Sequence, residues 1–223
     1  MNPSFNQRNP PRPHYPKPII GIVGGIGAGK TSVAAEFRQA GCCVIDSDEL
    51  AHQALNEPAI IQQLQQWFGD DIIGADGKID RRKLGAMVFR NPADMQRLNS
   101  RVHPRVEHLR RTIMDRVHDD PSVKAVVLDS PLLLESGLHR QCDAIIFVDA
   151  PLAIRQKRVM TGRGWDAAEL ARRENFQEAL DKKKQIADHI ISNDGTPTLL
   201  TNQVREVLNT VLARFGRIYQ GKG

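Results

Sequence analysis

The sequence predicts an α/β protein: a three-layer α/β/α arrangement with a parallel sheet between two helical layers, extended by a helical insertion and a second, smaller one. Three apolar runs, at 19–23, 125–128 and 144–148, are continuous rather than alternating, which indicates strands that are buried on both faces. The first run passes directly into a glycine-rich turn and a helix-forming stretch, which is the order of a βαβ unit. With 223 residues, 40% of them apolar, the chain is long enough to bury a core.

The core elements come in the order strand, helix, strand and then, after an insertion, three more strands. We assign them to residues 19–23, 30–40, 42–45, 125–128, 144–148 and 189–192. Gly41 ends the first helix, while Asp129 and Asp149 each end an apolar strand. Helical periodicity resumes at Leu50 after the second strand. The core therefore comprises residues 19–48, 123–155 and 185–218.

Two insertions interrupt this core, and we expect residues 49–122 to form a helical domain and 156–184 a lid. The first has no convincing strand, and it carries an apolar stripe at helical spacing with most of its arginines off the stripe. The stripe consists of Leu98, Val102, Val106, Leu109, Ile113 and Val117. His103-Pro104 predicts either a kink or a helix that starts at Pro104. The lid is dense in charge and contains a hinge-like stretch at 162–164.

Composition and charge exclude several classes of protein. Six of the 13 prolines lie in the first 18 residues, which predicts a disordered leader over 1–18. No apolar run is long enough to span a membrane, and three cysteines are too few for a disulfide framework, so we expect a cytoplasmic protein. The net charge is +5, but residues 78–116 alone hold 11 basic and 4 acidic side chains. The basic surplus is therefore local, in the helical insertion.

The segment Gly24–Thr31, GGIGAGKT, matches the phosphate-binding pattern G-x-x-x-x-G-K-[ST], between a strand and a helix as the pattern requires. Backbone N–H groups of such a loop and of the helix start bind nucleotide phosphates. We expect Lys30 to reach the β- and γ-phosphates and the Thr31 hydroxyl to ligate Mg²⁺. The predicted ATP-binding residues of this segment are Gly25, Ile26, Gly27, Ala28, Gly29, Lys30, Thr31 and Ser32. The loop predicts a P-loop nucleotide-binding fold.

A small-molecule kinase is the interpretation that gives both insertions a function, because one can hold the acceptor and the other can close over ATP. A GTPase is disfavoured because the chain has no N-K-x-D motif, and the D-x-x-G match at 71–74 follows no strand. Asp46 and Asp48 leave the carboxyl end of the second strand, where open α/β sheets place their ligands. We assign Asp46 to helix capping or a Mg²⁺-bound water, and Asp48 to catalysis.

Several segments resemble the dephospho-CoA kinase family in order and spacing, from about residue 18 to 215. They are Gly24–Thr31, Val44–His52, Arg81–Leu84 with Val88-Phe89, His103-Pro104, Leu128–Leu138, Ala187-Asp188 and Asn193–Gly195. The resemblance implies ATP-dependent phosphorylation of the ribose 3′-hydroxyl of dephospho-CoA, the last step of CoA synthesis. It also implies a nucleotide-binding core, a helical CoA domain and a lid.

The resemblance implies roles for single residues as well. Asp48 matches the proposed general base of the family, which has Asp-Ala-Asp where this chain has Asp46-Ser47-Asp48. The other matches are His103, Arg81 and Arg82 for the diphosphate of dephospho-CoA, Arg158 and Arg173 for the ATP phosphates or transition state, and Asn193 and Gly195 beside the adenine. The lid entry departs from the family at 160–165, so the sequence leaves open whether Arg158, Arg163, Arg172 or Arg173 faces the phosphates.

Two other functions stay open at this point. One is a P-loop nucleoside or nucleotide monophosphate kinase, which differs in its acceptor. The other is an ATP-dependent switch that binds a partner or nucleic acid through residues 78–116, but Phe89 is the one aromatic residue there that could stack on bases. We expect dephospho-CoA as substrate, no nucleic-acid or membrane partner, and a monomer or weak homo-oligomer.

Overall fold

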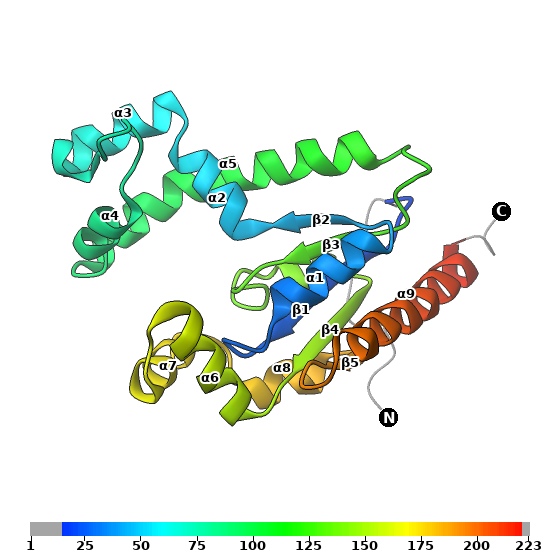
Figure 1. Cartoon of the computed structure of the whole chain (residues 1–223). Helices are drawn as coiled ribbons and strands as arrows, with labels where there is room; N and C mark the ends of the chain where they lie inside the picture. The colour runs from blue at the N-terminus through cyan, green and yellow to red at the C-terminus, as the bar shows by residue number, and fades with distance from the viewer. Residues whose placement is uncertain (1–14, 220–223) are drawn as a thin grey trace. The chain divides into compact units, whose positions relative to one another are not determined.

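The computed structural model describes residues 15–219, so most of the predicted leader lies outside the described residues (Figure 1). The described chain forms two compact units. One contains the residues up to Ile45 together with those from Arg116 onward, and the other contains residues 46–115. The first is an α/β unit and the second is helical.

The α/β unit is built on a five-stranded sheet. Its strands are β1 (Ile19–Gly24), β2 (Cys43–Asp46), β3 (Val126–Asp129), β4 (Ala144–Asp149) and β5 (His189–Ser192), in the spatial order β2-β3-β1-β4-β5. The central strand β1 pairs in parallel with β3 and β4, so that Ile20 lies opposite both Val127 and Ala144. This register brings the carboxyl ends of β1, β3 and β4 to one edge of the sheet.

Helices cover both faces of this sheet, which confirms the predicted fold class. The helices of this unit are α1 (Lys30–Gln39), α6 (Leu152–Arg163), α7 (Ala167–Glu174), α8 (Leu180–Ile186) and α9 (Pro197–Tyr219), with the short 3₁₀ helix η3 (Leu138–Gln141). Helices α1 and α9 pack on one face against Ile20, Ile22 and their neighbours (Figure 1). On the other face, a Cβ atom at Gly21 would lie 2.6 Å from Leu133, so the covering chain packs directly on β1.

The helical unit has its own apolar core. Its elements are α2 (Ser47–Leu55), α3 (Pro58–Phe68), the 3₁₀ helix η2 (Asp70–Ile72), α4 (Arg81–Val88) and α5 (Pro92–Val117), with an isolated antiparallel bridge between Ile73 and Ile79. The core groups Leu64, Ile72, Leu84 and Val102. No helix among residues 15–219 has both the length and the apolarity that a membrane crossing requires.

Helix α5 continues through Pro104, so of the two alternatives predicted at that residue a helix start was wrong. The predicted stripe explains the continuity, because Leu98 before the proline and Val106 after it pack against the same core. Packing on both sides outweighs the one backbone hydrogen bond that a proline removes. Arg110 is buried although it is not part of the predicted apolar stripe, and its guanidinium donates a hydrogen bond to Glu107.

Two helix ends are determined by local capping. Helix α2 begins at Ser47, because the Asp46 carboxylate accepts hydrogen bonds from the backbone N–H groups of Asp48 and Glu49, which confirms the capping role assigned to Asp46 from the sequence. The stretch at 162–164 ends helix α6, and Gly164 adopts a left-handed conformation with φ +67° after the last helical residue. A glycine in this position is a helix C-cap, so the predicted hinge-like stretch coincides with the end of α6.

Candidate active site

The P-loop, residues Gly24–Thr31, connects β1 to α1. Two of its positions require glycine, because the backbone has a positive φ there and a Cβ atom would lie too close to a neighbouring residue. Gly29 has φ +88°, and a Cβ atom there would lie 2.1 Å from Asn193 Nδ2. Gly27 has φ +78°, and its Cβ would lie 2.7 Å from the Arg155 carbonyl oxygen. Helix α1 begins at Lys30 with no side-chain cap, so its first N–H groups remain directed at the loop.

Lys30 is folded back over the loop that carries it. Its Nζ donates to the carbonyl oxygens of Gly24 and Gly25, both at 3.2 Å. Burial lowers the pKa of Lys30 from 10.5 to about 8, while the carboxylates of Asp129 and Glu174 oppose this shift. The ammonium group is thus held with little water around it, so an anion that reaches it gains strongly in electrostatic energy.

Asp129 is a site residue to which sequence reasoning gave no role. It ends β3 opposite Ile22 of β1, it is buried, and its charge acts on Lys30. The feature of the sequence that pointed to Asp129 was an apolar strand that ends in an aspartate; in the structure this strand pairs with β1, which leads into the P-loop. Thr31 and Ser32 lie exposed in the first turn of α1, as the P-loop pattern predicts.

Asn193 and Arg158 bind the P-loop from two other elements. Asn193, at the end of β5, is buried, and its Nδ2 donates to the Ala28 carbonyl at 2.8 Å. Arg158 of α6 donates to the Ala28 carbonyl at 3.1 Å and to the Asn193 carbonyl at 2.8 Å. The structure therefore brings these two predicted residues together with the loop, while Gly195 lies exposed two residues after Asn193.

The other predicted lid arginines make different contacts. Arg173 donates to Glu169 at 2.6 Å and lies 4.0 Å from the centre of the Trp165 ring. Arg172 also pairs with Glu169, at 2.5 Å. Arg163 lies 4.8 Å from the Trp165 ring centre, and its charge acts on Lys30. Of these four arginines, Arg158 is the one with a hydrogen bond to the P-loop in the part of the chain described.

A buried ion pair on the P-loop was missed by sequence reasoning. Arg155 Nη1 donates to Glu174 Oε1 at 2.5 Å and to the Ile26 carbonyl at 3.3 Å. The same Glu174 oxygen accepts the Ile26 backbone N–H at 3.1 Å. Arg155 is 6% exposed. No local sequence pattern predicts that this ion pair contacts the P-loop, because Glu174 lies 148 residues along the chain from Ile26.

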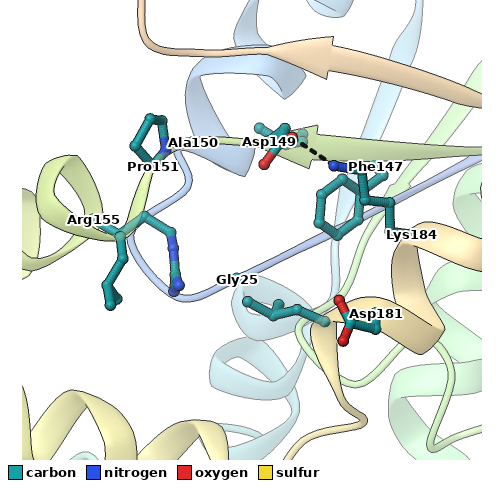
Figure 2. A pocket seen from close by; sticks show the side chains of 11 residues that line it. Gly25, Phe147, Asp149, Ala150, Pro151, Arg155, Asp181 and Lys184 are labelled. Carbon is teal, nitrogen blue, oxygen red and sulfur yellow. Dashed lines mark hydrogen bonds and ion pairs between the residues drawn. The ribbon is translucent and has the colours of Figure 1, made fainter.

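A cavity of about 260 Å³ opens beside Gly25, between the end of β4 and helices α6 and α8 (Figure 2). Figure 2 shows the Arg155 side chain on one side of it, and the ion pair of Lys184 with Asp149, 3.0 Å long, on another. The cavity is thus lined by charged side chains next to the P-loop, where a polar ligand of modest size fits.

The predicted acceptor residues belong to the helical unit and lie on three of its helices. Asp48 is exposed in the first turn of α2, directly after the capping Asp46. Arg81 and Arg82 are exposed in the first turn of α4, which the Asp80 carboxylate caps. His103 is exposed in the middle of α5.

The parallel sheet, the glycine loop and the partly buried lysine define a P-loop nucleotide-binding core. Comparison with known proteins narrows the class: a family profile described as dephospho-CoA kinase matches residues 18–198. This chain belongs to the dephospho-CoA kinase family, which confirms the resemblance found in the sequence and disfavours the two alternative functions.

Individual relatives agree over most of the chain. The dephospho-CoA kinase of Bacillus licheniformis is 38% identical over 198 residues, which cover 86% of this chain and 96% of the relative. A crystal structure from Thermus thermophilus has a TM-score of 0.76 at 32% identity, covering 87% of this chain and 97% of its own. The dephospho-CoA kinase of Campylobacter jejuni, at 22% identity and TM-score 0.60 with the same coverage, supports the fold.

Proposed function

We propose that this protein transfers the terminal phosphoryl group of ATP to the ribose 3′-hydroxyl of dephospho-CoA, giving CoA and ADP. The observation that carries the proposal is the family match over residues 18–198, which contains the complete P-loop with its partly buried lysine. ATP follows as the phosphoryl donor of this kinase family. The reaction is the last step of CoA synthesis.

The chain's own residues divide the work between donor and acceptor. Lys30, in its poorly solvated position, and Arg158, fixed between the Ala28 and Asn193 carbonyls, stabilise the charge on the phosphoryl group in transfer. Arg173 joins them from the lid, which requires it to leave Glu169. Asn193 and Gly195 flank the adenine. Phosphoryl transfer of this type depends mainly on such positioning and charge stabilisation.

Asp48 accepts the proton of the attacking hydroxyl. Two features favour it over Asp46: the Asp46 carboxylate accepts hydrogen bonds from two backbone N–H groups as the helix cap, whereas the Asp48 side chain is exposed in the first turn of α2. Arg81, Arg82 and His103 bind the diphosphate of dephospho-CoA from α4 and α5. These residues supply cationic or hydrogen-bonding groups suited to a doubly charged diphosphate.

The residues present also fit a Mg²⁺ ion. The Thr31 hydroxyl at the start of α1 and the Asp129 carboxylate at the end of β3 are hard oxygen donors of the kind that Mg²⁺ prefers. When bound, the ion neutralises charge on the phosphate oxygens. The chain's contribution is to hold it through Thr31, with Asp129 beside Lys30.

A coupled ADP-release assay tests the acceptor. The purified full-length chain is given MgATP with dephospho-CoA, adenosine or one nucleoside monophosphate at a time. We expect turnover with dephospho-CoA, a product heavier by one phosphoryl group in mass spectrometry, and no reaction with a 3′-deoxy analogue. The K30M variant, purified in the same way, accounts for any contaminating kinase.

Turnover with a monophosphate alone would overturn the proposal. Salt-dependent binding to random oligonucleotides without any kinase activity would instead support the switch alternative.

A further inference from the structure

Glu174, the last residue of α7, places a carboxylate directly on the P-loop. Its Oε1 accepts the Ile26 backbone N–H at 3.1 Å and, at 2.5 Å, a hydrogen bond from Arg155. A Cβ atom added at Gly25 would lie 2.7 Å from Arg155 Nη1 and 3.1 Å from this same carboxylate oxygen. The pair therefore lies in contact with the loop backbone, with no space for a further group between them.

The surroundings of this carboxylate are cationic. Arg155 is buried against it, and Lys183 of α8 is 2% exposed. Burial lowers the pKa of Lys183, and the Glu135 and Glu174 carboxylates oppose that shift, as Glu174 does for Lys30. Glu174 is thus paired with Arg155 of α6, and its charge also acts on Lys30 of α1 and Lys183 of α8, beside the charges of Asp129 and Glu135.

A phosphate group is recognised by the same set of donors. Backbone N–H groups of a P-loop, a guanidinium and an ammonium group bind phosphate oxygens through charge-assisted hydrogen bonds. One N–H group directed at one oxygen cannot also serve a second anion at that place. A phosphate on this part of the loop would also lie against Glu174, where two negative charges repel each other.

We propose that Glu174 occupies the place of a nucleotide phosphate oxygen on the P-loop in the nucleotide-free protein, and that Arg155 is a further phosphate-binding residue which passes from Glu174 to ATP. The proposal rests on the ATP site proposed above. ATP binding then withdraws the carboxylate from Ile26, and with it the carboxyl end of α7. Part of the binding free energy is spent on this displacement, so the observed ATP affinity is lower than that of an open loop.

The proposal predicts effects of opposite sign for the two partners of one ion pair. Removing Glu174 removes the competitor, so ATP binds more tightly; removing Arg155 removes a phosphate ligand, so ATP binds more weakly. An ion pair that only braces the lid would behave differently, because loss of either partner would disturb the loop in the same way and weaken ATP binding.

Calorimetric titration of the full-length chain with ATP measures this directly. We expect the ATP Kd of E174A to fall at least about fivefold and that of R155Q to rise at least about fivefold, the lower end of usual coupling between competing ligands. E174Q keeps the shape of the side chain and is used if E174A fails to fold, as judged by thermal melting. E178Q is the matched control, because Glu178 lies four residues on in the lid but pairs with Lys182.

An E178Q variant whose ATP Kd falls as much as that of E174A would show a general effect of lid charge and overturn the proposal. An unchanged or weaker ATP affinity in both Glu174 variants would overturn it too, as would an unchanged affinity in R155Q. Failure of the proposed function is distinguishable. If the two variants show these opposite shifts in ATP Kd but the wild-type chain does not phosphorylate dephospho-CoA, only the acceptor assignment is refuted. A wild-type chain that binds no ATP refutes both.

Discussion

Replacing Lys30 by methionine is expected to stabilise the nucleotide-free protein while abolishing ATP turnover. The pKa of Lys30 falls from 10.5 to about 8 on folding, which corresponds to a cost of about 3 kcal/mol for holding the charged form. Methionine avoids this cost but loses the two hydrogen bonds to the Gly24 and Gly25 carbonyls, worth roughly 1 kcal/mol each or less. We therefore expect a net gain of about 1–2 kcal/mol at pH 7.

The pH dependence separates the charge effect from the lost hydrogen bonds. Because the folded-state pKa is lower than the unfolded-state value, the unfolded chain binds more protons between about pH 8 and 10.5. The stability of the wild type therefore rises with pH in this window relative to K30M, by at most about 1.4 kcal/mol per pH unit. The advantage of K30M is full below pH 8 and disappears as the pH approaches 10.5.

Urea unfolding followed by circular dichroism at several values between pH 7 and 10 measures the difference, with EDTA present and nucleotide removed. K157M is the control, because Lys157 is exposed on α6 and its loss should change stability by no more than about 0.5 kcal/mol. A stability difference between wild type and K30M that is constant across the window would refute the reasoning, whatever its sign.

Three further substitutions address the loop and the acceptor. Gly29→Ala should lower the free energy of unfolding by about 1–3 kcal/mol in thermal melts, because Gly29 has a positive φ and its new Cβ would meet Asn193. Gly162→Ala is the control: its new Cβ, inside α6, has no neighbour within 4 Å, so the free energy of unfolding should instead rise by up to about 1 kcal/mol. Arg158→Met should raise the ATP Kd about tenfold in fluorescence titrations, since it removes one charge-assisted phosphate ligand. Arg158→Lys should restore only part of the ATP affinity, and full recovery with lysine would contradict a role for the planar guanidinium. Asp48→Asn should lower kcat by about 100-fold or more while the ATP Kd changes by less than about threefold, and a near-normal kcat would remove Asp48 from the catalytic residues.

The parts of the fold and site that could be predicted are those that short stretches of sequence specify. Strand β1, the P-loop and α1 are consecutive, so the pattern around Lys30 determined both their structure and their position. Continuous apolar runs predicted β3 and β4 because burial on both faces leaves no polar alternation. The Asp46 cap was predictable for the same reason, since its partners are two and three residues away.

The parts that could not be predicted depend on contacts between distant segments. Arg155 of α6 and Glu174 of α7 are two charged residues among many in these helices, and only the folded chain shows that both lie on Ile26. Arg173 carries a family resemblance, yet in the structure it contacts Glu169 and Trp165 on its own part of the lid. Charged side chains have many partners of similar energy within reach, so spacing alone does not choose among them.

The Lys30 and Glu174 arguments are coupled, and this coupling gives a test of both. The Glu174 carboxylate opposes the lowering of the Lys30 pKa, so its removal should lower that pKa further. The charged form of Lys30 then costs more in the folded state, and the K30M substitution should stabilise an E174Q background more than it stabilises the wild type. Residues in one electrostatic network commonly show such interaction energies, of about 0.5–3 kcal/mol. Unfolding measurements on the four proteins of this cycle at pH 7 give the value, and simple additivity would mean that the Glu174 charge does not act on Lys30, which would leave Asp129 as the carboxylate that opposes the lowering of the Lys30 pKa.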